Sequence, residues 1–463
     1  MDDSERASTG FGRWLAAVAL GGLAARVAFV LALRPHLITR YDPTLYHLMG
    51  LNLADGLGLV RPTLTGHGAL LPTAEFGPVL PVFVAAVTKL GVRSADGQAL
   101  ATAALGALTV VVVGLLGRRV AGPRVGIVAA TIVAFHPLLV QVDGALATES
   151  PYLLLVALLL LTTIRACDAP SVGRWIIVGL VAGLAVLARG EGLVLLAVLV
   201  VPAAAVRAWP GWWRALVGVA VPVLAAAVLL VPWTIRNFDE FGRIVPVSNN
   251  FGSVMLGANC PSTYEFGARQ GGWDFGCVAV YVAQHPKQGM VSRSENEAEV
   301  YARWRSAGIQ YALDHPGGFL AAFPARLART WGVYWLPGDQ IHYDLDDGRD
   351  RTLQTIGFVV ALVLLVLAVG GVRPLLRSLG ARRWVMLVLA APVAVTVLMA
   401  FATYGSTRFR IVAEPSIAVL AAYTLVSFAD RRRTRGRSGE AQAEVDETVA
   451  DGRADSPTLD VAC

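Results

Sequence analysis

Charged residues are scarce in this chain, and their scarcity argues against an ordinary soluble protein. They make up 16% of the 463 residues, whereas hydrophobic residues make up 55%. Soluble domains carry about 25% charged and about 45–50% apolar residues. The excess lies in blocks of Ala, Val, Leu and Gly, about 15–22 residues each, which suffices for helices that cross a hydrocarbon core. The composition therefore predicts an all-α polytopic membrane protein.

Several familiar motifs are also missing. The sequence has no Walker loop, no dinucleotide fingerprint and no repeated unit of about 20–50 residues. Its seven histidines show no metal-ligand spacing. We expect no nucleic-acid partner and no certain cofactor, and we leave a divalent metal ion as an open alternative.

The apolar blocks predict about ten spans, and the basic residues predict their orientation. The spans lie at about 11–33, 97–117, 123–141, 150–164, 175–188, 191–206, 215–232, 354–372, 384–403 and 409–428. Basic clusters occur at Arg6/Arg13, Arg118/Arg119/Arg124, Arg165/Arg174, Arg207/Arg214, Arg373/Arg377/Arg382/Arg383 and Arg431 to Arg437. With ten spans, all of these clusters share one side. The positive-inside rule makes that side cytoplasmic, with both termini, in a cell membrane.

Two segments on the other side are too long to be turns, at about 34–97 and 233–351. The first holds "DPTLYHLMGLNLADG" and "EFGPVLPVFVAAVTKLG", which we interpret as helices at the membrane interface. The second holds "SENEAEVYARWRSAGIQYALDHP" and "GGFLAAFPARLARTWGVYW", both predicted to be amphipathic helices. The tail at 429–463 is basic and then acidic without apolar periodicity, so we expect disorder there. Residues 1–428 form the predicted membrane domain.

Two of the four cysteines, Cys260 and Cys277, share the second outer segment. An outer segment faces an oxidising compartment, so a disulfide between them is predicted. Two unpaired buried thiols are the alternative.

Ionisable residues near membrane depth are costly and default to functional hypotheses. On the predicted topology nearly all of them lie at the outer ends of spans: Asp42, Asp143, Glu149, Arg189, Glu191, Arg236, Arg408 and Arg410. Tyr41, His47 and Glu75 are further candidates for lining the same cavity. The planar fork of arginine suits phosphate oxygens, and a carboxylate can deprotonate a hydroxyl. The pattern favours a substrate with a phosphate at headgroup level and an acceptor alcohol.

Each of these residues also has an ordinary structural interpretation. Asp42 suits a helix cap, and Glu149 suits a helix start. Arg189 and Glu191 suit a structural pair. Arg408 and Arg410 suit anchors that extend to the interface.

Over about residues 14 to 428 the chain resembles the GT-C superfamily of polyprenyl-phosphate-sugar glycosyltransferases. The similarity is to the branch with protein O-mannosyltransferases and the lipid A aminoarabinose transferase. It rests on "RYDPTLYHL", "FGPVLPVF", "ALATESPYLLL", "LARGEGLVLL", "PWTIRNFDEFGRIVPVS", "DHPGGFLAAFPARLARTW" and "STRFRIVAEP" in this order. Pro43 follows Asp42 where many relatives carry a second acid, and "FGPVLP" lacks the usual Pro-Pro pair. The resemblance therefore leaves the sugar and the acceptor open.

The resemblance implies a GT-C-like bundle and an inverting sugar transfer to an acceptor hydroxyl of a lipid, glycan or protein. Asp42 matches the catalytic base, and Glu149 matches an acid that helps to place the acceptor or a divalent ion. Arg189, Arg408 and Arg410 fall where basic residues hold the lipid phosphate of the donor.

Two other classes of protein are alternatives to a glycosyltransferase. A transporter or flippase also carries charges within the membrane, but it usually shows inverted repeats and broken helices near mid-membrane, and the sequence displays neither. A non-catalytic membrane scaffold needs no acids and arginines gathered on one face.

Overall fold

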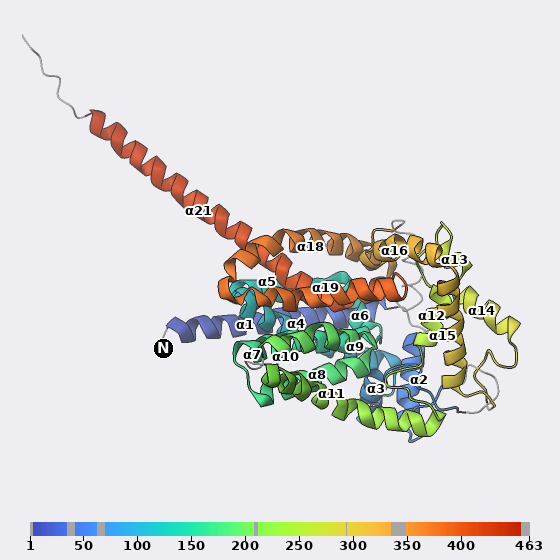
Figure 1. Cartoon of the computed structure of the whole chain (residues 1–463). Coiled ribbons are helices and arrows are strands. Elements are labelled where there is room, and N and C mark those ends of the chain that lie inside the picture. The colour runs from blue at the N-terminus through green and yellow to red at the C-terminus, as the bar shows by residue number, and fades with distance from the viewer. Residues whose placement is uncertain are drawn as a thin grey trace, which may run out of the picture.

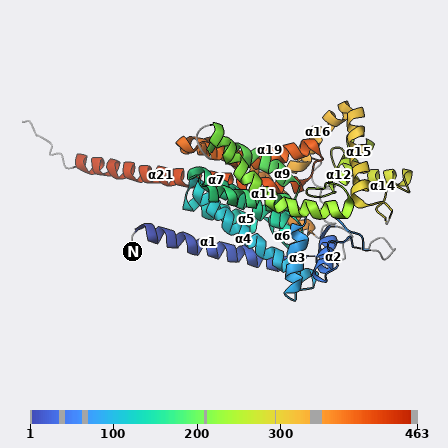
Figure 2. The same cartoon turned by 60° about the horizontal axis from the view of Figure 1, so that its bottom comes forward.

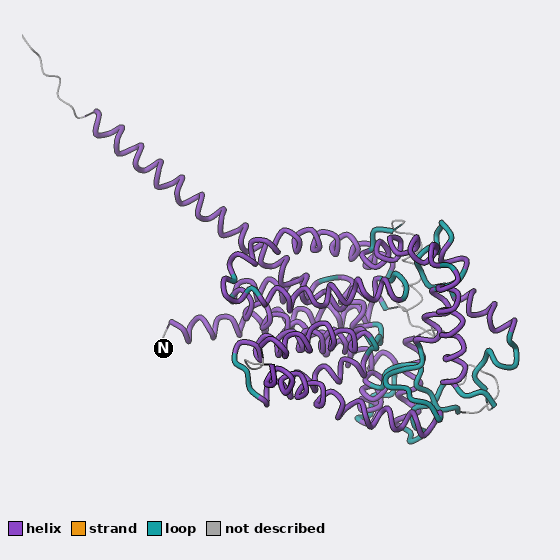
Figure 3. The backbone as a smooth tube through the Cα atoms, viewed as in Figure 1, coloured by secondary structure: helices purple, strands orange, loops and turns teal. Residues whose placement is uncertain are grey.

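Helices account for most of the chain that the structure describes, as Figure 3 shows. The computed structural model describes residues 3–34, 42–62, 70–207, 212–292, 294–334 and 349–454. Within these ranges β pairing is limited to one antiparallel bridge between Val60 and Pro72. The all-α prediction is confirmed.

Seven helical stretches in the described ranges are long and apolar enough to cross a membrane, and they lie alongside one another in a bundle (Figure 1). They are Gly10–Leu33 in α1 (Asp3–Ala28) and η1 (Phe29–Leu33), α4 (Ala95–Ala121), α7 (Glu149–Asp168), Ala215–Phe241 in α11 (Trp212–Phe241), α18 (Arg351–Ser378), Gly380–Ala402 in η3 (Gly380–Arg382) and α19 (Trp384–Ala402), and Thr407–Thr434 in α20 (Thr407–Arg410), η4 (Ile411–Ala413) and α21 (Glu414–Ala454).

A bent pair of helices is the eighth candidate span. Its two halves, α5 (Pro123–Phe135) and α6 (Pro137–Gly144), meet at 59°. Pro137 disfavours helical backbone at the residue before it, and His136 is accordingly extended (φ −67°, ψ 116°). The imidazole of His136 then accepts a hydrogen bond from the backbone N–H of Leu138 at 3.2 Å, which starts the second half.

The two remaining expected spans are present as shorter or interrupted helices. The first is α8 (Val172–Ala188), an apolar helix of 17 residues. The second consists of α9 (Glu191–Leu195), the π-helical η2 (Leu196–Val200) and α10 (Val201–Arg207). By length and composition the described chain thus holds seven spans, or eight with the bent pair, where the sequence predicted about ten.

The predicted arginine clusters meet at one end of the bundle. Asp168, at the end of α7, pairs with Arg119 of α4 at 2.6 Å and with Arg382 of η3 at 3.0 Å. Arg124 of α5 pairs with Asp430 of α21 at 2.9 Å. Such exposed pairs stabilise a protein little, but they show which helix ends lie together. Figure 1 places the start of α1 at this same end.

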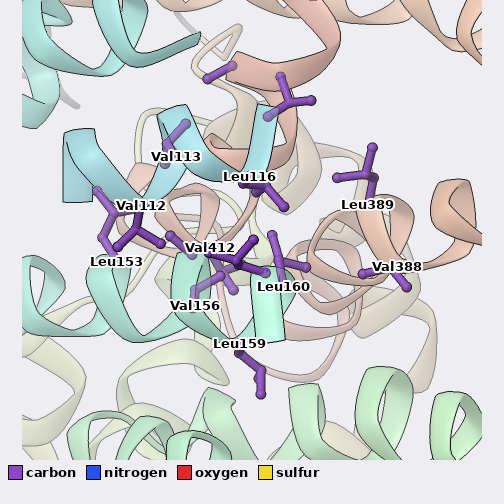
Figure 4. Close-up of a cluster of buried hydrophobic side chains, with 14 of the residues drawn as sticks. Val112, Val113, Leu116, Leu153, Val156, Leu159, Leu160, Val388, Leu389 and Val412 are labelled. Carbon is purple, nitrogen blue, oxygen red and sulfur yellow. The ribbon is translucent and has the colours of Figure 1, made fainter. Parts of the chain in front are cut away.

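The bundle packs around small residues and branched aliphatic side chains. A Cβ on Gly117 of α4 would lie 3.0 Å from the Cα of Gly126 in α5, so glycine lets the two backbones approach closely. Elsewhere in the bundle, buried Val and Leu side chains of α4, α7 and α19 pack together (Figure 4).

The predicted outer segments gather at the opposite end of the bundle (Figure 2). The first contains α2 (Asp42–Ala54) and α3 (Val79–Lys89), and α3 is too short to span a membrane. The second contains α12 (Phe251–Ala258), α13 (Pro261–Tyr264), α14 (Phe275–Gln284), α15 (Glu297–Asp314) and α16 (Pro316–Trp331). The expected disulfide joins Cys260 to Cys277.

The disorder expected after residue 428 stays a prediction. Helix α21 continues without a break to Ala454. This stretch is rich in Ala, Glu and Arg, which are strong helix formers. Residues 455–463 of the tail lie outside the described ranges.

A buried ion pair ties α1 to the bent span. Nε of Arg26 lies 2.7 Å from Oδ2 of Asp143, and both side chains are fully buried. The same guanidinium donates to the carbonyl oxygens of Ala134 at 2.9 Å and Val133 at 3.2 Å, which the bend at His136 leaves without helical partners. Asp143 was predicted to line the outer cavity, but it holds the bent helix against α1 instead.

We predict that Asp143→Ala destabilises the bundle by about 3–5 kcal/mol, because it leaves the buried Arg26 charge unpaired. Denaturant unfolding in detergent micelles measures the change. The matched control is Arg93→Ala, which removes an exposed pair with Asp55 and should leave the unfolding curve in place. Equal curves for Asp143→Ala and wild type would contradict this role.

Candidate active site

Arg408 joins two distant parts of the chain at the outer end of the bundle. Its Nη1 lies 3.0 Å from Oδ2 of Asp42, the first residue of α2. Its Nε donates to Oε1 of Glu149, the first residue of α7. Asp42 and Arg408 are 27% and 22% exposed, whereas Glu149 is 1% exposed. A solute therefore reaches Asp42 and Arg408 but meets little of Glu149.

A second arginine completes the charge balance of Glu149. Nη1 of Arg189 lies 2.7 Å from Oε1 of Glu149, and its Nη2 lies 2.9 Å from Oε1 of Glu191. Arg189 is the extended residue that ends α8, and Glu191 begins α9. The anticipated Arg189–Glu191 pair exists, but it also belongs to the cluster around Glu149.

Helix geometry explains why acids occupy these positions. Asp42, Glu149 and Glu191 are each the first residue of a helix. The first turn of a helix has unpaired N–H groups and a partial positive charge, so it favours a carboxylate. The local sequence thus places three acids at helix starts, and the packing brings these starts to Arg408 and Arg189.

A small cavity of about 20 Å³ lies beside this cluster, roughly the space of one water molecule. Its charged lining consists of Glu149, Arg349, Arg408, Arg410 and Glu414. Three arginines and two carboxylates leave one formal positive charge, which suits an anion. Nε of Arg410 lies 2.8 Å from Oε1 of Glu414, and both side chains are buried.

Tyr404 is partly buried in the turn between α19 and α20, close to Arg408 and Arg189. Burial raises the pKa of its hydroxyl to about 12. The side chain therefore stays neutral, and able to donate a hydrogen bond, at physiological pH.

Glu75 belongs to a neighbouring polar group that connects the two outer segments. Oε2 of Glu75 lies 2.9 Å from Nη2 of Arg61, and Oε1 accepts a hydrogen bond from the hydroxyl of Tyr301 at 2.7 Å. Glu297 accepts from the hydroxyl of Thr73 at 2.6 Å. Burial, with the nearby carboxylate of Glu297, raises the pKa of Glu75 despite the opposing charge of Arg61.

The other candidate lining residues hold backbone or neighbouring side chains. Arg236 donates to the carbonyl oxygens of Leu59 and Thr73, each at 2.9 Å. Nδ1 of His47 lies 2.7 Å from Oε1 of Gln98. Tyr41 lies outside the described residues. Arg236 and His47 therefore shape the outer part around the cluster instead of joining it.

Several residues of these networks were missed from the sequence: Arg26, Arg61, Tyr301, Arg349, Tyr404 and Glu414. Arg26 falls inside an apolar span, where the charge itself was a signal. Arg349 stands just before an apolar span, as Arg408 does, and that position was also a signal. Arg61 and Tyr301 lie in polar segments where no local pattern distinguishes them.

Among the described residues, no group of three or more His, Cys, Asp or Glu side chains lies close enough together to hold a metal ion. The carboxylates of Asp42 and Glu149 both face Arg408. The charge that balances these two acids in this structure is therefore a guanidinium.

The helical bundle and the outer helical part make this an all-helical, multi-pass membrane protein with a GT-C-like fold. Residues 75–235 match the sequence model of a family described as "Dolichyl-phosphate-mannose-protein mannosyltransferase". The predicted resemblance to the GT-C superfamily is confirmed. No curated protein matches the chain.

Solved structures of the oligosaccharyltransferase AglB from Archaeoglobus fulgidus share this fold. The complex with an inhibitory peptide and a dolichol-phosphate has a TM-score of 0.51 and 16% identity, covering 92% of this chain and 52% of that one. The complex with Zn and sulfate has a TM-score of 0.50 and 16% identity, covering 93% and 51%. The chain thus spans about half the length of these structures. ArnT from Cupriavidus metallidurans bound to undecaprenyl phosphate aligns at a TM-score of 0.43 and 18% identity, covering 90% and 78%.

We predict that Glu149→Gln lowers the melting temperature, because Arg189 and Arg408 then lose the buried carboxylate that both of them contact. The variant should also gain more thermal stability from inorganic phosphate than wild type does, because an added anion replaces the lost one. Thermal unfolding in detergent, with and without phosphate, measures both effects. An unchanged melting temperature would show that Glu149 does not balance these arginines.

Proposed function

We propose that the chain is a membrane glycosyltransferase that moves a sugar from a polyprenyl-phosphate-linked donor to an acceptor hydroxyl. The observation that carries this proposal is the position of Arg408, which bridges Asp42 and Glu149 at the end of the bundle opposite the arginine clusters. The partly exposed carboxylate of Asp42 can act as a base, and the partly exposed guanidinium of Arg408 beside it can bind a phosphate.

The comparisons support the donor class. The segment that matches the mannosyltransferase family, 75–235, contains Glu149 and Arg189. One AglB structure of the same fold was solved with a dolichol-phosphate. We extend this chemistry to the present chain as a proposal.

Asp42 acts as the general base in this mechanism. The acceptor oxygen attacks the anomeric carbon of the sugar as its proton passes to the carboxylate of Asp42. The bond from this carbon to the phosphate oxygen breaks on the opposite face, so the configuration inverts. Asp42 is open enough to meet an acceptor, whereas Glu149 is closed off by its neighbours.

The arginines stabilise the leaving group. A sugar ester of polyprenyl phosphate carries one negative charge, and the released polyprenyl phosphate carries up to two. The extra charge develops next to Arg408, so the guanidinium binds the transition state more strongly than the ground state. Arg189 and Arg410 support the same phosphate by balancing Glu149, Glu191 and Glu414. Glu149 keeps Arg408 directed at the site.

The reaction is placed at the outer face of a cell membrane. The arginine clusters lie at the opposite end of the bundle, and the positive-inside rule makes that end, with both termini, cytoplasmic. The site then faces outward, at the depth of lipid headgroups. A lipid, a glycan or a protein with a free hydroxyl reaches it from there.

We predict that Asp42→Asn slows sugar transfer by about 10²–10⁴-fold, because the amide cannot accept the proton. Binding of the polyprenyl-phosphate donor should stay close to wild type. A radiolabelled sugar transfer assay on purified protein measures the rate. The control is Asp55→Asn, just after the same helix, which should keep normal turnover. Near wild-type transfer by Asp42→Asn would refute the assignment of the base.

We predict that Arg408→Lys raises the donor KM and lowers kcat, and that Arg408→Ala loses more of both, because lysine keeps the charge but lacks the planar fork. Steady-state kinetics at varied donor concentration separate the two parameters. Arg351→Lys, an exposed change at the start of α18, serves as the control. If both Arg408 variants keep wild-type kinetics, the phosphate binds elsewhere.

A further inference from the structure

The disulfide closes a loop that is already well ordered by its own polar contacts. Cys260 and Cys277 are 17 residues apart. Between them, the carboxylate of Asp274 accepts from the hydroxyl of Ser262 at 2.6 Å and pairs with Arg269 at 2.7 Å. The backbone N–H of Gly271 donates to the carbonyl oxygen of Thr263 at 2.8 Å. We call residues 260–277 the disulfide loop.

Two buried arginines of α16 hold this region against the end of α19. Nε of Arg329 donates to the carbonyl oxygen of Gln270 at 2.7 Å, and its Nη2 donates to that of Ala268. Arg326 donates to the carbonyl oxygen of Ala258, just before the loop, at 3.1 Å. Its other terminal nitrogen donates to the carbonyl oxygen of Phe401 in α19 at 3.0 Å. The side chain of Arg326 therefore bridges the start of the disulfide loop and the helix that leads to Arg408.

The disulfide loop also contacts the turn before Arg408 directly. The backbone N–H of Gly405 donates to the carbonyl oxygen of Gly271 at 2.7 Å. A Cβ on Gly405 would lie 2.3 Å from the carbonyl oxygen of Arg326, so the turn at this point admits only glycine without a shift. The hydroxyl of Ser406 then accepts from the N–H of Arg408 at 3.3 Å and starts α20. An unbroken series of contacts therefore connects the disulfide loop to Arg408.

We propose that the disulfide loop, through Arg329 and Gly405, is the positioning element for Arg408. This inference rests on the proposed function, because Arg408 is taken there as the ligand of the donor phosphate. The disulfide restricts the loop when its contacts open, so the carbonyl oxygen of Gly271 stays in place to receive the N–H of Gly405. Arg329 donates to two backbone carbonyl oxygens of the disulfide loop and acts on the site through this backbone.

This positioning role predicts an effect on binding of the donor phosphate. A loosened loop lets the turn at 403–406 shift, and the fork of Arg408 then meets the phosphate out of alignment. Misplacing one charge-assisted hydrogen bond weakens binding by about tenfold. Binding of the acceptor depends on Asp42, which belongs to α2. Loosening the disulfide loop should therefore leave the acceptor KM unchanged.

The test is a mutant cycle on the full-length protein in detergent, with undecaprenyl phosphate as the probe. We expect the double substitution Cys260→Ser/Cys277→Ser to raise the Kd of the probe by about tenfold, and Arg329→Met to raise it similarly. Arg408→Ala should raise it by at least as much. Added to Arg408→Ala, either change should have no further effect, because both act through Arg408. Arg243→Ala breaks an exposed pair with Glu299 in the same outer part and should leave the Kd unchanged.

The outcomes separate the two proposals. If Arg408→Ala leaves the Kd of the probe unchanged, the proposed function fails. If Arg408→Ala weakens binding but the serine double variant and Arg329→Met bind as wild type does, the positioning role is wrong. If either loop variant weakens probe binding further when Arg408 is already alanine, the positioning role is also refuted. Such a loss would mean that the loop affects binding by a route that does not involve Arg408. If the serine variant does not fold, Arg329→Met decides by the same cycle.

Discussion

The outer end of this bundle depends on the buried charge of Glu149. A carboxylate taken out of water is costly unless cations and hydrogen bonds replace its solvation. Glu149 has the start of α7 on one side and the guanidinium groups of Arg189 and Arg408 on the other. These two arginines come from the end of α8 and from α20, so one buried acid ties three segments together. The more exposed Asp42 joins this arrangement through Arg408.

The same use of rare charges recurs elsewhere in the molecule. Arg26 and Asp143 tie the first span to the bent one. Glu297 of α15 accepts hydrogen bonds from Thr73, the backbone of Ala74 and Asn249, which joins the two outer segments. A charged residue in these apolar surroundings has few possible polar partners. Each such pair therefore helps to specify which helices meet. The low charge content of the sequence is thus consistent with a fold in which single ion pairs define contacts between elements.

Sequence reasoning succeeded where the signal is local. The long apolar blocks and the amphipathic stretches of the second outer segment marked helices that the structure contains. The structure brings together Asp42, Glu149, Arg189, Glu191 and Arg408 from the expected group, and their roles stay predictions. Asp143 and Arg236 contact other partners. Position along a span predicts depth in the bundle, whereas the direction of a side chain around the helix axis depends on the neighbouring helices.

The sequence by itself determined the class of fold and the basic end of the bundle, because hydropathy and helix-start chemistry act over a few residues. Only the tertiary structure decided which charges meet. Asp42 and Arg408 are 366 residues apart, and their contact exists because the outer segments fold back over the end of the bundle. Likewise, nothing local connects the disulfide loop to the turn before Arg408. Their hydrogen bond requires α16 to lie between α13 and α19, and that arrangement follows from packing of the whole chain.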